Sequence, residues 1–259
     1  MSMGDDVKTR GGRRWLRWLG WAVVGLVLVV AGGLAWWVLG APDAEPGPLQ
    51  AVVDDPDVEV TYGDDVVTVA PVGGAPDTAP SVVFYPGARV PPEAYVATWA
   101  PVVEATGATV HIPAMPLRLA VLDADAAAGV RADATTTGPW FLAGHSLGGT
   151  MAASHAAATA DDWDGVVFWA SYPNGDVLAD TGLAVTSISG TADGLTTPDD
   201  VEASRADLPG DASFVVLDGV NHAQFGAYGE QGGDNPAEVD DVTARELVGD
   251  ATVAALSGG

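Results

Sequence analysis

From residue 58 onward, short apolar runs alternate with longer, alanine-rich segments. Within each run the hydrophobicity is continuous rather than alternating, which predicts strands buried on both faces. We expect these strands at residues 82–85, 109–112, 140–143, 166–170, 185–189 and 214–217. The segments between them predict helices near residues 92–106, 120–133, 148–160, 198–207 and 236–255. This alternation is typical of an α/β domain, a mostly parallel sheet with helices on both faces.

Local signals refine the edges of this domain. Residues 58–62 and 66–70 are separated by Gly63-Asp64-Asp65, which predicts an antiparallel hairpin at the sheet edge. Pro198 favours a helix start after Thr197 because proline suits the first helical position. By the same rule, Asn235-Pro236 with a glutamate at the capping-box position predicts the start of the last helix. There is no internal repeat and no insertion large enough for an independent lid.

The N-terminal region differs from the rest. Residues 19–39 form a 21-residue stretch without a charge, long enough as a helix to cross a hydrocarbon core of about 30 Å. Tryptophans mark both ends of the stretch, at positions 15, 18, 21, 36 and 37. Residues 1–18 carry five basic side chains, so the positive-inside rule predicts a cytoplasmic tail. We therefore expect a single-pass transmembrane helix, a cytoplasmic N-terminus and an extracytoplasmic domain at residues 58–259.

A cleaved signal peptide is the alternative for this region. Arg13-Arg14 resembles a twin-arginine export motif, and Leu39-Gly40-Ala41 is a poor match to a cleavage site. The apolar run exceeds the usual 7 to 15 residues of a signal peptide, which favours the anchor. Residues 40–57 are rich in Pro, Asp and Ala without periodicity and predict a flexible linker.

The net negative charge of the chain argues against nucleic acid as a partner. After residue 40 the chain holds 33 carboxylates and five arginines, a formal net charge of −28. Such a surface repels phosphate backbones, so we expect no nucleic-acid partner. Aspartate outnumbers glutamate 27 to 8, and lysine is absent after position 8. This pattern resembles salt-adapted, haloarchaeal-type proteins; an acidic protein from a GC-rich bacterium is the alternative.

The possible covalent nucleophiles are few. The chain has no cysteine, which excludes disulfides, thiolate metal sites and a sulfur nucleophile. Its single lysine, Lys8, lies in the N-terminal tail. Serine and threonine are therefore the leading candidates. No metal or cofactor site is expected.

Ser146 is the candidate nucleophile. Gly144-His145-Ser146-Leu147-Gly148 matches Gly-x-Ser-x-Gly, directly after an expected strand and directly before an expected helix. This is the context of a nucleophile elbow, a turn so tight that side chains at the flanking positions would collide. The helix N-terminus that follows favours negative charge beside the serine.

His222 is the candidate base, because each of the other three histidines has a structural interpretation. His111 falls in a buried strand, His155 in an alanine-rich helix, and the side chain of His145 is expected to point away from the nucleophile. His222 lies in a loop after the last strand, where imidazole can take and return a proton. Asp193 follows the strand at 185–189 at the same sheet edge and is the candidate that orients His222.

An oxyanion hole needs two N–H donors. The first is expected to be the backbone of Leu147. The second should come from the loop after the strand at 82–85, with Ala88 as first choice and Gly87 as second. Arg89 either faces the cleft, where it would attract an anionic substrate, or forms a surface ion pair.

Three segments resemble the α/β-hydrolase superfamily, and within it the α/β-hydrolase fold 5, dienelactone-hydrolase-like subgroup. They are residues 83–90 with Tyr95, residues 144–149, and residues 219–226 with Tyr228, Gly229 and Gln231. The resemblance covers residues 58–255 and implies a Ser-His-Asp hydrolase without a cofactor. Serine replaces the cysteine of dienelactone hydrolases, so their substrate is not implied. Tyr85-Pro86-Gly87 also replaces the His-Gly of many lipases.

The expected function is hydrolysis of a small ester-like substrate through an acyl-enzyme on Ser146. A carboxylic ester is the first expectation for the bond, ahead of a thioester or an amide. A catalytically silent, membrane-tethered binding protein with the same fold is the alternative from another class. Haloperoxidase-like or C–C hydrolase chemistry on the same triad is a third.

Overall fold

The computed structural model describes residues 40–132, 134 and 136–258, together with eight positions before residue 40 (Leu19, Trp21, Gly25, Leu28, Val29, Gly32, Gly33 and Trp37). The expected basic tail at 1–18 and most of the expected transmembrane helix at 19–39 lie outside the described residues. Among the residues that are described, no helix is both long and apolar enough to cross a membrane. Residues 42–259 form one compact unit.

An eight-stranded sheet forms the centre of this unit, in the order β1-β2-β4-β3-β5-β6-β7-β8. Its strands are β1 (Val58–Tyr62), β2 (Val66–Pro71), β3 (Ser81–Tyr85), β4 (Thr109–Pro113), β5 (Trp140–His145), β6 (Gly165–Trp169), β7 (Ala184–Gly190) and β8 (Ser213–Leu217). The hairpin of β1 and β2 is antiparallel and lies at the edge, as predicted. β2 also pairs antiparallel with β4, and all other neighbours are parallel.

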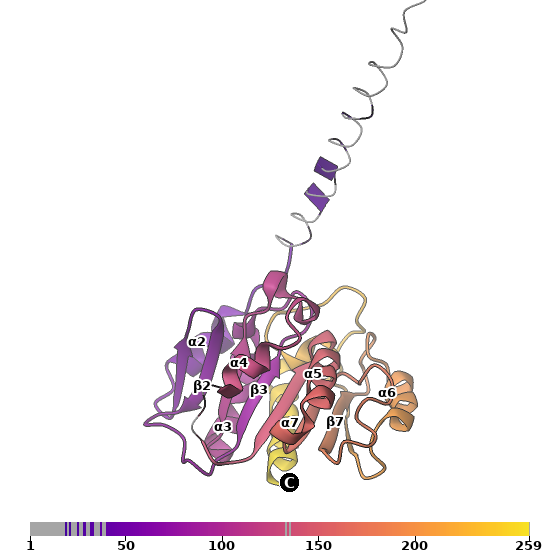
Figure 1. Ribbon diagram of the computed structural model, residues 1–259. Helices are drawn as coiled ribbons and strands as arrows, with labels where there is room; N and C mark the ends of the chain where they lie inside the picture. Colours follow the sequence, from indigo (N-terminus) through magenta and orange to yellow (C-terminus); the bar gives the residue numbers. More distant parts are fainter. Residues whose placement is uncertain are drawn as a thin grey trace, which may run out of the picture. The chain divides into compact units, whose positions relative to one another are not determined.

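Helices cover both faces of the sheet, which confirms the predicted α/β class (Figure 1). The α-helices are α2 (Pro46–Val53), α3 (Val96–Thr106), α4 (Ala126–Ala132), α5 (Leu147–Ala158), α6 (Pro198–Ser204) and α7 (Asp241–Ser257). Short 3₁₀ helices are η1 (Pro92–Tyr95), η2 (Pro116–Arg118), η3 (Ala120–Leu122), η4 (Ala160–Asp162), η5 (Arg205–Asp207) and η6 (Ala223–Phe225). α3 and α7 pack on one face, and α4 and α5 pack on the other.

The larger core lies under α3 and α7 and is built on aromatic rings. The rings of Trp99 and Trp169 stack at a centroid distance of 4.7 Å, and both side chains are fully buried. Phe84 contacts both rings. Burial of each such side chain stabilises the fold by about 2 to 3 kcal/mol. This core fixes the carboxyl ends of β3 and β6 beside β5, which leads into the Gly-x-Ser-x-Gly turn.

The expectation of a flexible linker at 40–57 is wrong for most of that segment. Residues 46–53 form α2, in which Val52 is buried and Leu49 packs on the larger core. The Glu45 N–H donates to the Ala227 carbonyl at 2.8 Å. Arg118 Nη1 donates to the Pro42 carbonyl at 2.6 Å. The folded unit therefore begins near Pro42, about sixteen residues before the expected boundary at residue 58.

The last helix begins later than predicted. α7 starts at Asp241, and the side chain of Asp240 caps it by accepting from the N–H groups of Val242 and Thr243. The Glu238 N–H instead donates to the Gly219 carbonyl, which holds this residue outside the helix. The start of α6 is as predicted: Pro198 is the first helical residue after the cap, Thr197.

We expect the folded unit to depend on salt. Ion pairs such as Arg118–Asp43 (3.1 Å) and Arg205–Glu202 (2.6 Å) engage single carboxylates, and five arginines face 33 carboxylates after residue 40. Screening shortens the range of the remaining repulsion from about 30 Å at 0.01 M salt to about 3 Å at 1 M. Far-ultraviolet circular dichroism should show unfolding in dilute buffer and folding in molar KCl. Equal stability in both buffers would refute this expectation.

Candidate active site

Ser146 lies at a sharp turn between β5 and α5. Its backbone has φ 52° and ψ −128°, a conformation that costs a non-glycine residue roughly 1 to 3 kcal/mol. Hydrogen bonds hold the turn: the Ser146 N–H donates to the Trp169 carbonyl at 3.1 Å, and Ser171 Oγ donates to the Ser146 carbonyl at 2.6 Å. A Cβ at Gly144 would lie 2.6 Å from the Gly149 nitrogen, so the turn admits only glycine there. The strand–turn–helix context predicted from the sequence is present.

His222 and Asp193 meet at the carboxyl edge of the sheet. Asp193 follows β7, His222 follows β8, and His222 Nδ1 donates to Asp193 Oδ2 at 2.8 Å. Both side chains are almost fully buried. The other carboxylate oxygen of Asp193 accepts from the N–H groups of Leu195 (2.8 Å) and Thr196 (2.7 Å). These bonds fix the carboxylate as an acceptor and hold the His222 proton on Nδ1.

The second ring nitrogen of His222, Nε2, takes no part in the bond to Asp193. It is buried and has no hydrogen-bond partner among the residues that the structure describes. Since Nδ1 carries the proton, Nε2 is a lone-pair acceptor in the neutral ring. The ring centroid of His222 lies 4.5 Å from that of His145, the residue next to Ser146. The loop of His222 thus reaches the turn that carries the candidate nucleophile.

His145 packs against the candidate base. Its ring is buried beside that of His222, and Phe225 stacks on it at 5.8 Å. Burial, together with the neighbouring His222, holds the pKa of His145 well below its usual value. His145 is therefore neutral at physiological pH and contributes packing rather than charge.

A hydrogen-bond chain joins His145 to the loop after β3. The Gly87 N–H donates to Tyr95 Oη at 2.9 Å, and a second hydrogen bond of 2.9 Å joins the Tyr95 hydroxyl to His145 Nδ1. Burial raises the pKa of Tyr95, so it keeps its proton. Because the Gly87 N–H is used in this chain, Gly87 is unsuited to be an oxyanion donor. Ala88 and Leu147 are left as the candidate pair.

The other two histidines have structural surroundings. His155 lies in α5 and bonds Asp125 through Nδ1 at 3.0 Å. His111 lies in β4, stacks on Trp140 at 6.0 Å, and has a pKa that burial lowers to about 4. Neither lies in the loops that carry Ser146, Asp193 and His222. Between residues 40 and 258, positions 133 and 135 aside, no cluster of three His, Asp or Glu side chains is arranged to hold a metal ion.

Local sequence patterns do not reveal Ser171, which bonds the Ser146 carbonyl, or the link that Tyr95 makes between the end of β5 and the loop after β3. Neither residue belongs to a short motif, and their partners lie 25 and 50 residues away. In the sequence, Tyr95 stands out only through the family resemblance. The signal that marks it is burial: it is fully inaccessible and packs its ring on Phe84 at 4.7 Å.

Solved structures share this fold. Est1E from Butyrivibrio proteoclasticus has a TM-score of 0.57 and 12% identity, covering 78% of this chain and 99% of that chain. The hyperthermophilic esterase from Pyrobaculum calidifontis has a TM-score of 0.56 and 19% identity, covering 81% and 89%. The carboxylesterase CesB from Bacillus subtilis has a TM-score of 0.55 and 12% identity, covering 82% and 95%. At these identities the likeness concerns the fold.

A search of the curated proteins gave no match. Residues 81–246, which make up more than half of the chain, match the alpha/beta hydrolase family. This segment runs from β3 to α7 and contains the turn at Ser146 and the His222–Asp193 pair. The chain therefore belongs to the alpha/beta hydrolase family.

Proposed function

We propose that the protein is a serine hydrolase that cleaves carboxylic esters through a Ser146–His222–Asp193 triad. One observation carries the proposal: a buried histidine is bonded to a buried aspartate in the loop that reaches the Ser146 turn, and its second nitrogen has no hydrogen-bond partner within the described part of the chain. A buried polar atom without a partner is costly, by about 1 to 3 kcal/mol. A hydroxyl group that gives up its proton in the reaction would be a suitable partner for His222 Nε2.

The reaction has two halves. Ser146 Oγ attacks the ester carbonyl carbon while its proton passes to His222 Nε2. The tetrahedral intermediate then expels the alcohol, which takes the proton from His222 and leaves an acyl group on Ser146. In the second half, water attacks the acyl carbonyl and gives a proton to His222. The bond between the acyl carbon and Ser146 Oγ then breaks, Ser146 takes the proton from His222, and the acid is released. Asp193 keeps the ring oriented and stabilises its cationic form.

Backbone N–H groups stabilise the oxyanion in this proposal. Leu147 is the first residue of α5, so its N–H has no acceptor within the helix. The Ala88 N–H is the second donor, from the loop that Tyr95 ties down through Gly87. Each such donor contributes about 10² to 10³ in rate in serine hydrolases. The α5 N-terminus adds favourable partial charge beside the oxyanion.

A panel of activated substrates tests this function against its alternatives. In molar KCl, a serine esterase turns over p-nitrophenyl esters of short acids, whereas a binding protein that has lost catalysis turns over none. Parallel thioester and anilide substrates establish which bond is preferred; we expect the oxygen ester first. Absence of turnover with every activated ester, in protein shown to be folded, would favour the binding-protein alternative.

We also propose that residues 19–39 anchor the chain in a membrane, with the N-terminus cytoplasmic and the hydrolase domain outside. The sequence supports this through the 21 uncharged residues and the basic flank. Because Pro42 and Glu45 bond to the folded unit, the anchor would join the domain through a short connection. Full-length protein should sediment with membranes and a chain starting at Pro42 should not. A mature N-terminus near Ala41 would instead show a cleaved signal peptide.

A further inference from the structure

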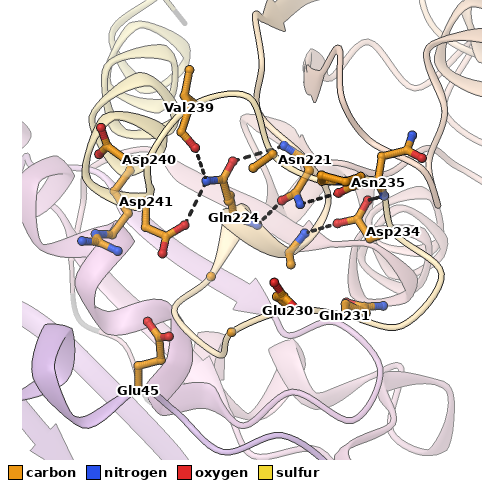
Figure 2. A pocket seen from close by; sticks show the side chains of 16 residues that line it. Glu45, Asn221, Gln224, Glu230, Gln231, Asp234, Asn235, Val239, Asp240 and Asp241 are labelled. Atoms are coloured by element: carbon orange, nitrogen blue, oxygen red, sulfur yellow. Dashed lines mark hydrogen bonds between the residues drawn. The ribbon is translucent and has the colours of Figure 1, made fainter.

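Residues 230–240, here called the strap, connect the region of η6 to α7 without forming a helix or strand. The strap lies beside two loops, one with Asp193 and one with His222. Figure 2 shows Asn221, Gln224, Asp234 and Asn235 joined by hydrogen bonds at one side of a pocket of about 570 Å³. None of these four residues contacts the reacting atoms in the proposed mechanism. Their bonds instead connect the strap to the loops.

Asp234 bonds both loops at once. Its Oδ2 accepts from the Ala223 N–H at 2.9 Å, and its Oδ1 accepts from the Gly194 N–H at 2.9 Å. Ala223 directly follows His222, and Gly194 directly follows Asp193. One carboxylate therefore holds the residues next to both members of the histidine–aspartate pair. Oδ1 also accepts from the Asn235 N–H at 2.9 Å.

The close approach of the strap depends on Gly194. A Cβ at this position would lie 2.7 Å from the Asn235 nitrogen, so a larger residue would push the strap away from the Asp193 loop. On the other side, Asn221 Nδ2 donates to the Asn235 carbonyl at 2.8 Å. Gln224 Nε2 donates to the Val239 carbonyl at 2.9 Å, farther along the strap. The strap is thus fixed on both sides of His222.

Asp234 is not an alternative catalytic acid. His222 Nδ1 bonds Asp193, and both oxygens of Asp234 already accept backbone N–H groups. Its carboxylate accepts three backbone N–H groups at 2.9 Å, and such charge-assisted bonds are roughly twice as strong as neutral ones. The carboxylate acts as a cross-link between two backbone segments.

We infer that Asp234 is a positioning residue that holds the loops of Asp193 and His222 in register, so that Nε2 of His222 stays aimed at Ser146. The inference rests on the proposed serine-hydrolase function. Nearer the sheet, the Ala192 N–H donates to the Val220 carbonyl and the Gly219 N–H donates to Thr191 Oγ1, so the two loops are also joined before the pair. Asp234 joins them after the pair, at Gly194 and Ala223. Small displacements of a catalytic base, about 1 Å, lower rates by about 10²-fold.

Asp234→Asn is the sharpest test because it keeps shape and removes one acceptor. The amide oxygen serves one loop, while the amide NH₂ faces the N–H of the other and cannot accept from it. We expect kcat for a p-nitrophenyl ester to fall about 10- to 100-fold, with KM changed less than about twofold. The rate of labelling by a fluorophosphonate should fall by the same factor as kcat.

Asp240→Ala is the matched control. Asp240 also accepts two backbone N–H groups, but both belong to α7 and neither adjoins the histidine–aspartate pair. This variant loses a helix cap, so its midpoint of denaturation falls, while its kcat stays at the wild-type value. An Asp234→Asn variant with wild-type kcat, or one whose loss of kcat is matched by Asp240→Ala, would overturn the inference.

A readout that needs no turnover separates this inference from the proposed function. The Nδ1 proton shared by His222 and Asp193 is buried and should give a downfield proton NMR resonance in the wild type and in Asp240→Ala. In Asp234→Asn we expect this resonance to shift upfield or broaden. If wild-type protein hydrolyses no ester yet the resonance changes as stated, the function fails and the positioning role holds. An unchanged resonance contradicts the positioning role, whatever the activity.

Discussion

Ser146→Ala is expected to lower kcat/KM for an activated ester by about 10⁴- to 10⁶-fold, the loss typical of removing a triad nucleophile. The reason is chemical, because alanine offers no oxygen to form the acyl-enzyme. Residual turnover would come from the oxyanion donors alone. Steady-state kinetics in molar KCl measure the effect, and thermal denaturation shows that the variant is folded.

Ser154→Ala provides the control for this substitution. Ser154 lies two turns further along α5, and its hydroxyl donates to the Thr150 carbonyl within the same helix. Removing that hydroxyl leaves the site intact, so kcat/KM should match the wild type. Wild-type turnover by Ser146→Ala would show that another group is the nucleophile.

Gly148→Ala is expected to have the second large effect, which is a loss of stability. An added Cβ at Gly148 would lie 2.2 Å from the Tyr85 carbonyl oxygen and 2.3 Å from that of Pro86. Both atoms are backbone and cannot move aside as a side chain would, so α5 must shift away from β3. We expect a loss of at least about 4 kcal/mol in the free energy of unfolding, the range reached by severe steric conflicts. Denaturant unfolding at constant high salt measures it.

Gly129→Ala is the matched glycine substitution. Gly129 lies in α4 with nothing within 4 Å of an added Cβ. Alanine there should leave stability unchanged or raise it by up to about 1 kcal/mol, because alanine favours the helix. If the free energy of unfolding of Gly148→Ala equalled that of Gly129→Ala, this result would contradict the close approach of α5 to β3.

Sequence patterns predicted the inner strands well because those strands are buried on both faces. The expectation that the strand at 214–217 is buried on both faces is wrong, because β8 lies at the edge of the sheet and Val216 is 55% exposed. The runs at β3, β5 and β6 are continuously apolar, and all fifteen of the residues at 81–85, 140–144 and 165–169 are buried. The turn at Ser146 could be predicted from the adjacent residues in the sequence, since glycines must flank it. Signals of this kind involve neighbours in sequence, so no knowledge of the fold is needed to read them.

Features that depend on distant partners were not predictable. α2 looked like a linker because its burial comes from packing against α3 and β1, which no local pattern encodes. The expected start of the last helix failed because Gly219 binds the Glu238 N–H and Asp240 supplies a cap. Asp234 resembled any other aspartate in an acidic loop, since its partners lie 11 and 40 residues away.

The most direct test of the central claim is covalent labelling of the domain at residues 42–259. A fluorophosphonate probe reacts with a serine only when a base and an oxyanion site activate it. In molar KCl, we expect one labelled peptide that contains Ser146, and no labelling in Ser146→Ala or His222→Ala. Labelling elsewhere, or none in folded wild-type protein, would contradict the assignment of Ser146, His222 and Asp193 as a catalytic triad.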